Sequence, residues 1–211
     1  MPGALMPALD ELELVGERVK LAPPRVEDAA VAFAMIAGRR EILDWIEWAG
    51  PREVEELAER ARHWCVDAGA AGVDHHLAIL DAADGRVLGA IAVRGVDRGG
   101  AIDLGYWIGV EHQGRGAASE AVRLALWLAF EALDAPRATA CVFAGNEASR
   151  RVLEKRGFQL LSAAPEACAS AAPSACGPRP VLRFALERER WRALDPFEPA
   201  GLRLRFRQRL P

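Results

Sequence analysis

The stretch that decides the fold is Gly105–Ala121, which reads GYWIGVEHQGRGAASEA. It begins as a strand, passes through a turn of small residues at Gln113–Ala118 and continues as a helix. A helix N-terminus presents unpaired N–H groups and the positive end of the helix dipole. Because small residues let that backbone approach an anion closely, the turn predicts a site for a pyrophosphate-containing ligand.

Two common nucleotide-binding motifs do not fit this turn. A P-loop requires a Gly-Lys-Ser/Thr sequence, which the chain lacks. A dinucleotide-binding fold places its glycine turn after the first strand of a parallel unit, whereas this turn lies in mid-chain. The residues before it instead predict an antiparallel meander, because the strands over 76–81, 86–94 and 101–110 follow one another through short connections. Asp84-Gly85 is the hairpin signal between the first two of these strands.

The remaining elements alternate between strands and helices. Upstream, the pattern predicts a strand over 17–22, a helix over 28–38 with Asp28 as N-cap and Gly38 beyond its end, and a helix over 51–69. Downstream, it predicts a helix over 118–133, a strand over 137–143, a helix over 146–156, and strands over 158–162 and 181–187. The helix between two strands is a crossover, so the strands over 101–110 and 137–143 should be parallel. The 163–180 segment, rich in Ala, Ser and Pro, reads as a loop.

These elements predict an α/β (α+β) fold with a mixed central sheet, an antiparallel meander, a parallel strand pair and flanking helices. We expect one domain over 17–192, an N-terminal extension over 1–16 and a C-terminal tail over 193–211. The tail segment Leu202–Leu210 alternates Arg with Leu and Phe, which suits an edge strand, a basic arm or a solvated tail.

Composition excludes several functional classes. The 211 residues are 51% hydrophobic and 27% charged, which is a globular composition. A formal net charge of -3 gives no global electrostatic reason to bind DNA. No apolar run is long enough to cross a bilayer, and Met1–Leu14 lacks the pattern of a secretory signal, so we expect a cytoplasmic protein without membrane partners.

The cysteines and histidines give no metal site. Cys65, Cys141, Cys168 and Cys176 form no C-x-x-C pair, and their spacing is poor for zinc. We expect free thiols, with a Cys168–Cys176 disulfide as the alternative.

Two sequence blocks carry a family resemblance. Gln113, Gly116 and Ala118 match the pattern Q-x-x-G-x-G/A, which is the pyrophosphate-binding motif of the Gcn5-related N-acetyltransferases. The second block, NEASRRVLEKRGF at Asn146–Phe158, resembles the later helix of that family, which lies beneath the acyl donor. The order of elements also agrees, so the resemblance covers residues 17–192. Both blocks are most similar to the branch that acetylates the N-termini of ribosomal proteins.

The resemblance implies a binding site for acetyl-CoA as acyl donor. In the family, the two parallel strands splay apart at their ends, and the thioester lies alongside the first of them. The backbone N–H of Val110 would then polarise the thioester carbonyl in the manner of an oxyanion hole. The residues implied in binding are Ile108, Val110, Gln113, Gly114, Arg115, Gly116, Ala117, Ala118 and Asn146.

Two residues are the candidates for proton transfer. Asp103, two residues before Gly105, is the candidate base, although the related branch often has the longer Glu there, and a solvated strand residue is the alternative. Ser149 is the candidate acid for the leaving thiolate, or else an ordinary first-turn serine. Tyr106 could also donate a proton, but the only tyrosine of the chain, in a buried strand, is more often a core residue.

The acceptor is a primary amine, either a protein N-terminus or a small molecule. Trp45 and Trp48 lie where the family builds its acceptor site, and they suit either a pocket or the core. A non-catalytic module that binds acyl-CoA is the competing function, since it would keep the same glycine turn. A homodimer is compatible with the resemblance, but the sequence does not decide it.

Overall fold

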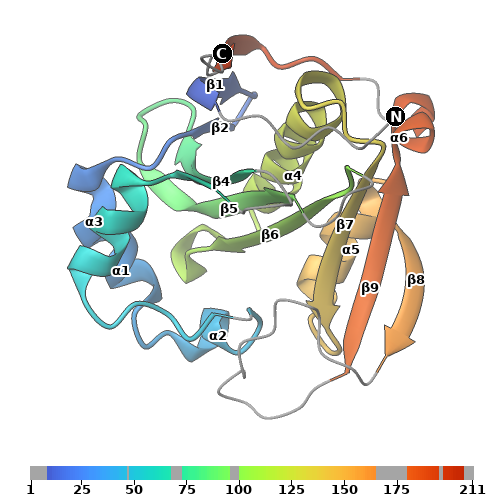
Figure 1. Ribbon diagram of the computed structural model, residues 1–211. Coiled ribbons are helices and arrows are strands. Elements are labelled where there is room, and N and C mark those ends of the chain that lie inside the picture. Colours follow the sequence, from blue (N-terminus) through green and yellow to red (C-terminus); the bar gives the residue numbers. More distant parts are fainter. Residues whose placement is uncertain are drawn as a thin grey trace.

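A computed structural model of the chain describes residues 9–46, 48–67, 73–95, 100–164, 180–194 and 197–206. Within these ranges, ten strands form one sheet in the order β10-β1-β2-β4-β5-β6-β7-β9-β8, with β3 paired to β4 (Figure 1). The strands are β1 (Leu9–Val15), β2 (Val19–Ala22), β3 (Cys65–Asp67), β4 (Val73–Asp81), β5 (Val87–Gly95), β6 (Ile102–Ile108), β7 (Arg137–Phe143), β8 (Gln159–Ala164), β9 (Val181–Glu187) and β10 (Gly201–Phe206).

Helices cover both faces of this sheet. They are α1 (Ala29–Ile36), α2 (Arg40–Leu43), α3 (Val54–Arg62), α4 (Ala117–Trp127), α5 (Glu147–Lys155) and α6 (Arg188–Leu194), with short 3₁₀ turns η1 (Val26–Asp28) and η3 (Val110–His112) and a π-helical turn η4 (Leu128–Ala132) that extends α4. The larger core joins α4 and α5 to one face, where Leu77, Ile79 and Leu104 are buried. On the other face, Met35 of α1 packs against Ala78 and Leu80. The mixed α/β fold predicted from the sequence is therefore confirmed.

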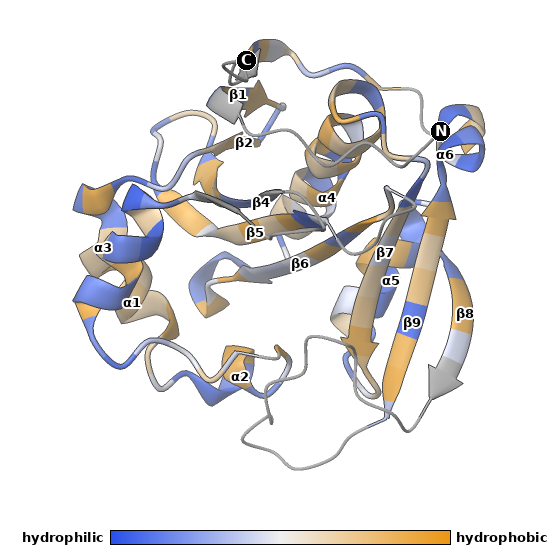
Figure 2. Ribbon diagram, viewed as in Figure 1, coloured by the Kyte–Doolittle hydropathy of each residue, from blue (hydrophilic) through white to orange (hydrophobic). Residues whose placement is uncertain are grey.

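The central strands separate at one point. Strands β4, β5 and β6 form the predicted antiparallel meander. Strands β6 and β7 are parallel, as predicted, but they pair only through Ile102 with Ala138 and Asp103 with Thr139. Beyond that point they diverge, as Figure 1 shows, and β7 continues with β9 and β8 as a second wing of the sheet. Figure 2 shows that β7 and β9 are largely hydrophobic, whereas α3 and α6 carry many hydrophilic residues.

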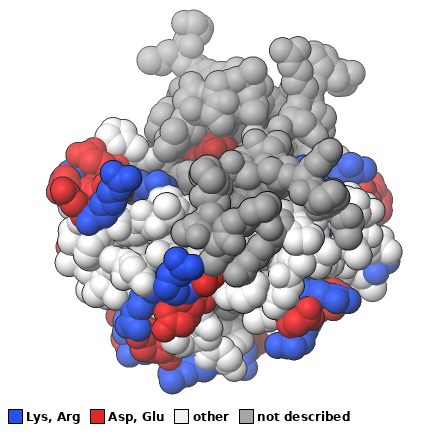
Figure 3. Space-filling model, turned by 90° about the horizontal axis from the view of Figure 1, so that it is seen from below, with Lys and Arg blue, Asp and Glu red and all other residues white. Residues whose placement is uncertain are grey.

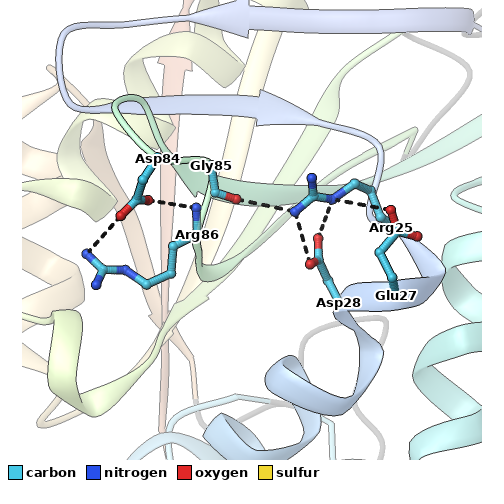
Figure 4. Close-up of polar contacts among 6 residues, drawn as sticks. All are labelled: Arg25, Glu27, Asp28, Asp84, Gly85 and Arg86. Carbon is cyan, nitrogen blue, oxygen red and sulfur yellow. Dashed lines mark hydrogen bonds and ion pairs between the residues drawn. The ribbon is translucent and has the colours of Figure 1, made fainter.

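The β4–β5 hairpin is tied to the start of α1. Gly85 has a φ of 75°, which a glycine adopts without strain, and Asp84 Oδ1 accepts the Arg86 N–H at 2.9 Å. Arg25 donates to the carbonyl of Gly85 at 3.4 Å and to Asp28 Oδ1 at 3.0 Å (Figure 4). The hydrogen bond with Asp28 raises the pKa of the Arg25 guanidinium above its ordinary value. This contact fixes the start of α1 against the sheet.

Helix boundaries differ from the sequence prediction at two places. The helix predicted over 51–69 ends at Arg62, and Cys65–Asp67 forms strand β3 against β4. The apolar residues Trp64 and Cys65 continued the helical spacing, but pairing with an adjacent strand satisfies their backbone groups instead. Asp28 makes no side-chain cap for α1, because its carboxylate is bound by Arg25, whereas Gly38 follows the helix with the expected positive φ of 68°.

The two ends of the described chain join the sheet. Strand β10 pairs with β1 in antiparallel register from Val15–Gly201 to Leu9–Phe206, so the edge-strand interpretation of the alternating tail is confirmed for Gly201–Phe206 and the solvated tail is wrong there. Both strands lie outside the 17–192 range. Strand β8 extends to Ala164, two residues into the predicted loop over 163–180, whose residues 165–179 lie outside the described part.

The described surface mixes charges of both signs. Seen from below, Lys and Arg side chains alternate with Asp and Glu around the described part of this face (Figure 3). Among the described residues, no helix is long and apolar enough to traverse a bilayer.

Glu120 anchors the β1–β2 turn to helix α4. Its carboxylate accepts the backbone N–H of Glu17 and, at 3.1 Å, that of Arg18, and its side chain is only 11% exposed. Gly16 lies so close that a Cβ there would fall 2.3 Å from Glu120 Oε1. A carboxylate in the first helical turn also interacts favourably with the helix dipole. Glu120 therefore fixes the first turn of α4 relative to the sheet.

We predict that Glu120→Ala lowers the free energy of unfolding by about 1–3 kcal/mol, because two backbone donors lose a charged acceptor. Urea denaturation measures this difference. Glu154→Ala is the matched control, since Glu154 forms an exposed pair with Arg150 on α5 and should cost at most about 0.5 kcal/mol. Equal losses in the two variants would contradict the anchoring role.

Candidate active site

A cavity of about 830 Å³ opens where β6 and β7 part. The turn before α4 forms one end of it, and the first turns of α5 form the adjacent wall. Ile42 of α2, Leu57 of α3, and Trp45 and Trp48 of the segment between these helices line the other side. The cavity therefore reaches from the helix N-termini on one face of the sheet to the α1–α3 layer on the other.

The Gln113–Ala118 turn directs backbone donors into this cavity. Gly114 and Gly116 have φ values of 73° and 85°, which bend the chain sharply from β6 into α4. Gln113 Nε2 donates to the carbonyl of Ile108 at 3.1 Å and closes the turn on the strand end. Helix α4 has no side-chain N-cap, and its first internal bond runs from the N–H of Glu120.

The N–H groups before Glu120 therefore have no acceptor within the helix. The residues of this turn that line the cavity are Gln113, Gly114, Gly116, Ala117, Ala118 and Ser119. Uncapped donors and the positive end of the dipole make this end of the cavity an anion site. The sequence prediction did not include Ser119. Its position in the first turn of α4 was the signal that could have identified it.

The first turn of α5 contacts β6 across the gap. Asn146 Oδ1 accepts the N–H of Ser149 at 3.1 Å, which confirms the predicted N-cap, and Asn146 also lines the cavity. Ser149 Oγ lies 2.9 Å from the hydroxyl of Tyr106, so a hydrogen bond connects the two wings of the sheet on the α5 side. Burial raises the pKa of Tyr106 to about 12, which keeps its hydroxyl protonated.

Two basic residues of α5 that the sequence analysis passed over also line the cavity. Arg151 and Lys155 are four residues apart and share one helix face with Ala148, and Ser149 lines the cavity from the neighbouring face. Among the described residues, neither forms an ion pair, whereas the neighbouring Arg150 pairs with Glu147 and Glu154. Helical spacing from Ser149 could not have identified them, because residues two and six positions further on do not share its helix face.

Asp103 lies at the point where β6 and β7 separate. Arg94 Nη2 donates to its Oδ2 at 2.6 Å, and Thr139 Oγ1 is 3.2 Å from Oδ1. Its side chain is 12% exposed and contributes to the cavity wall. Strand alternation places Asp103 and Trp107 on the face covered by α1 and α3, and Tyr106 on the face of α4 and α5. Asp103 therefore lies on the α1–α3 side of the sheet.

Most of the predicted site residues meet in the cavity. Asp103, Ile108, Gln113, Gly114, Gly116, Ala117, Ala118, Asn146 and Ser149 all line it. Val110 and Arg115 do not: Val110 begins the 3₁₀ turn η3, and Arg115 lines a separate hollow of about 270 Å³ beside Arg18 and Arg86. The binding roles of these residues stay predictions.

The cysteine prediction needs a correction. Cys141 on β7 lines the cavity and is in a disulfide, so the chain does not carry four free thiols. Sequence spacing could not reveal this bond, because a disulfide depends on which cysteines the fold brings together. Among the described residues, no group of three or more His, Cys, Asp or Glu side chains could hold a metal ion.

His76 on β4 also lines the cavity. It points to the same face of the sheet as Ala92 and Gly105, since β4, β5 and β6 align these three residues in one row. Burial lowers the pKa of His76 below its ordinary value. Asp74 opposes that shift, and the charges of Arg60 and Arg94 add to it.

Comparison with known proteins agrees with this geometry. Residues 18–159 match the family model described as "Acetyltransferase (GNAT) domain". "Probable N-acetyltransferase YjcK" of Bacillus subtilis is 38% identical over 87 residues, which are 40% of this chain and 48% of that protein. The chain therefore spans about half the length of this curated relative.

Solved structures share the fold. Mycobacterium smegmatis RimJ in complex with CoA-disulfide superimposes with a TM-score of 0.67 at 22% identity, over 93% of this chain and 92% of that chain. Spermidine N-acetyltransferase from Vibrio cholerae in complex with CoA and spermine gives a TM-score of 0.66 at 18% identity, over 82% and 97% of the two chains. The family model matches most of the sequence, and the sheet is split beside a helix that has no side-chain N-cap. This chain therefore belongs to the Gcn5-related N-acetyltransferase (GNAT) family.

Proposed function

We propose that this protein transfers an acetyl group from acetyl-CoA to a primary amine. The observation that carries the proposal is the uncapped N-terminus of α4, which opens into a cavity that also holds Ser149 and Tyr106. That end of the cavity suits a pyrophosphate, and the gap between β6 and β7 suits an extended thioester arm. The layer of α1–α3 leaves room for a second substrate on the opposite side.

The residues present fit acetyl-CoA. The N–H groups of Gly114, Gly116 and Ala117 would hold the pyrophosphate, and Arg151 and Lys155 would hold other phosphate oxygens. The side-chain NH₂ group of Asn146 would donate to the arm of the ligand, because the side-chain oxygen already accepts the N–H of Ser149. Acetyl-CoA supplies the activated acetyl group, and the chain binds and orients it.

Strand β6 offers backbone donors to the thioester carbonyl. Gly109 N–H bonds to Leu88 on β5, so the alternation of a strand turns the N–H groups of Tyr106 and Ile108 toward the gap. Beyond Asp103 no residue of β7 pairs with them. We assign the polarising role to these two groups, because Ile108 and Tyr106 line the cavity and Val110 does not.

The reaction is a direct displacement. The amine nitrogen attacks the carbonyl carbon, the carbon–sulfur bond breaks, and the sulfur takes a proton from Ser149, whose hydroxyl is replenished through Tyr106. A group on the α1–α3 face removes the amine proton; Asp103 is the base that the sequence predicts, and His76 lies in the same cavity wall. The acceptor is a protein N-terminus or a small amine that enters past Trp45 and Trp48.

We predict CoA release when the protein is incubated with acetyl-CoA and a panel of peptides, polyamines, amino acids and aminoglycosides. Thiol detection measures turnover, and mass spectrometry identifies an acceptor that has gained one acetyl group. Acetyl-CoA binding without turnover on any amine of the panel would contradict the enzyme and support a non-catalytic acyl-CoA-binding module.

We predict that Arg151→Glu weakens acetyl-CoA binding by about tenfold or more, because it reverses a charge that faces the phosphates. Isothermal titration with acetyl-CoA measures the affinity. Arg150→Glu is the control, since Arg150 lies one residue away on the same helix but pairs with Glu147 and Glu154. The same loss of affinity in both variants would indicate a general charge effect and remove Arg151 from the site.

We predict that Ser149→Ala lowers kcat by about tenfold, a modest loss because a thiol with an ordinary pKa near 8.5 is already a good leaving group. Tyr106→Phe should lower kcat less. If Tyr106 acts through Ser149, the double variant should be no slower than Ser149→Ala alone. Losses that multiply in the double variant would show that the two hydroxyls act independently.

A further inference from the structure

We propose that His76 is the catalytic base that accepts the proton of the attacking amine, and that the Asp103 carboxylate positions Arg94. This inference rests on the proposed acetyl transfer and deepens it. The sequence directs attention to Asp103 because that residue precedes the glycine of the central strand. The structure places a second proton acceptor on the same face and brings Arg94 and Thr139 against the Asp103 carboxylate.

The first step concerns the contacts of the Asp103 carboxylate. Arg94 Nη2 donates to Oδ2 at 2.6 Å, and Thr139 Oγ1, which also donates to the Ile102 carbonyl at 3.0 Å, lies 3.2 Å from Oδ1. A hydrogen bond between a carboxylate and a guanidinium is of the strong, charge-assisted kind, and here it occupies Oδ2. Asp103 therefore holds Arg94 and secures the junction of β6 and β7.

The second step is the position of His76. Its row across the sheet, which continues through Ala92 to Gly105, lies two residues nearer to the Gln113–Ala118 turn than the row of Arg94 and Asp103. At about 3.3 Å per residue, this shift of about 7 Å along the strands offsets the two-strand separation, so His76 and Asp103 lie at similar distances from the Tyr106–Ile108 donors. Within this row the Ala92 methyl group lies between His76 and Gly105, and the Arg94 guanidinium reaches over Gly105 from the neighbouring row.

The spacing of the strands also limits the length of the proton path between the amine and His76. Strands lie about 4.8 Å apart, so His76 stands about 10 Å from Gly105 across the sheet. An amine held in the cavity beside the Arg94 guanidinium, with water bridging to His76, covers that interval. His76, Ala92 and Gly105 all line the cavity that also reaches Ile108. The reaction site and the base thus share one solvent-connected space.

The third step is the charge around His76. The charged groups that face it are Asp74 on its own strand, Arg94 on β5 and Arg60 on α3, with Asp103 beyond Arg94 on β6. Asp74 Oδ1 also accepts the N–H of Gly95 at 3.1 Å, and Arg60 lies over the ring of Trp48 at 4.6 Å from its centroid. Burial and the two arginines favour the neutral imidazole, which is the form that accepts a proton.

The proton balance is closed. The amine proton passes to a ring nitrogen of His76 as the new amide bond forms, and His76 returns it to solvent through the open cavity after the product leaves. The thiolate receives its proton separately from Ser149, and the Ser149–Tyr106 pair takes one back from solvent in the cavity that both residues line, so no additional reactant is needed.

The test is the pH dependence of kcat at saturating acetyl-CoA and amine, which reports groups in the enzyme–substrate complex. For the wild-type protein, we expect kcat to fall as the pH drops through the lowered pKa of His76, because the protonated imidazole no longer accepts a proton. His76→Gln should lower kcat by about 10²-fold and remove this acidic limb, with acetyl-CoA affinity unchanged. His63→Gln, at the exposed end of α3 and outside the cavity, should match the wild-type protein.

Asp103→Asn separates the two roles. Loss of this anion should make His76 harder to protonate, so the acidic limb should persist and move to lower pH. A limb that persists in His76→Gln and disappears in Asp103→Asn would overturn the proposal and return the base to Asp103. Wild-type kcat in a folded His76→Gln that binds acetyl-CoA would overturn it too. Absence of turnover by the wild-type protein with every amine would instead overturn the proposed function itself.

Discussion

The parting of β6 and β7 is the constraint on which the site depends. These strands share only two residue pairs, at Ile102–Ala138 and Asp103–Thr139. A continuous ladder would satisfy the facing N–H and C=O groups, so the open gap needs other contacts to persist. Thr139 Oγ1 donates to the Ile102 carbonyl at 3.0 Å at the junction, and the Tyr106–Ser149 contact connects the two wings further along. The part of the cavity between β6 and β7 lies between these two contacts.

Much of this arrangement could be predicted from local sequence. Small residues and hydrophobic periodicity predict the strand, glycine turn and helix of Gly105–Ala121. Asn146 predicts the start of its helix because Asn is a common N-cap residue. The parallel relation of β6 and β7 followed from the crossover helix between them. Such features are decided within a few residues of chain, or by a general rule of chain topology.

The features that could not be predicted depend on distant residues. The Asp103 carboxylate meets Arg94 because Gly105 leaves space for the guanidinium, and a Cβ at Gly105 would lie 3.0 Å from Arg94 Nη2. His76 enters the site through a register that runs across two strands. The end of α3 at Arg62 is set by the pairing of β3 with β4, which overrides the helical spacing of Trp64. In each case a tertiary contact outweighs local preference.

Strand alternation also gives the two proton transfers separate compartments. Tyr106 and Ser149 lie on the side of α4 and α5, whereas His76, Arg94 and Asp103 lie on the side of α1 and α3. If both groups faced the same side, an acid and a base within reach of each other could exchange a proton directly, without any chemistry on the substrates. The sheet between them prevents direct contact, so a proton passes from one side to the other only through the gap, by way of the reacting atoms or the solvent there. A split sheet therefore supplies both the room for the substrates and the separation that the reaction needs.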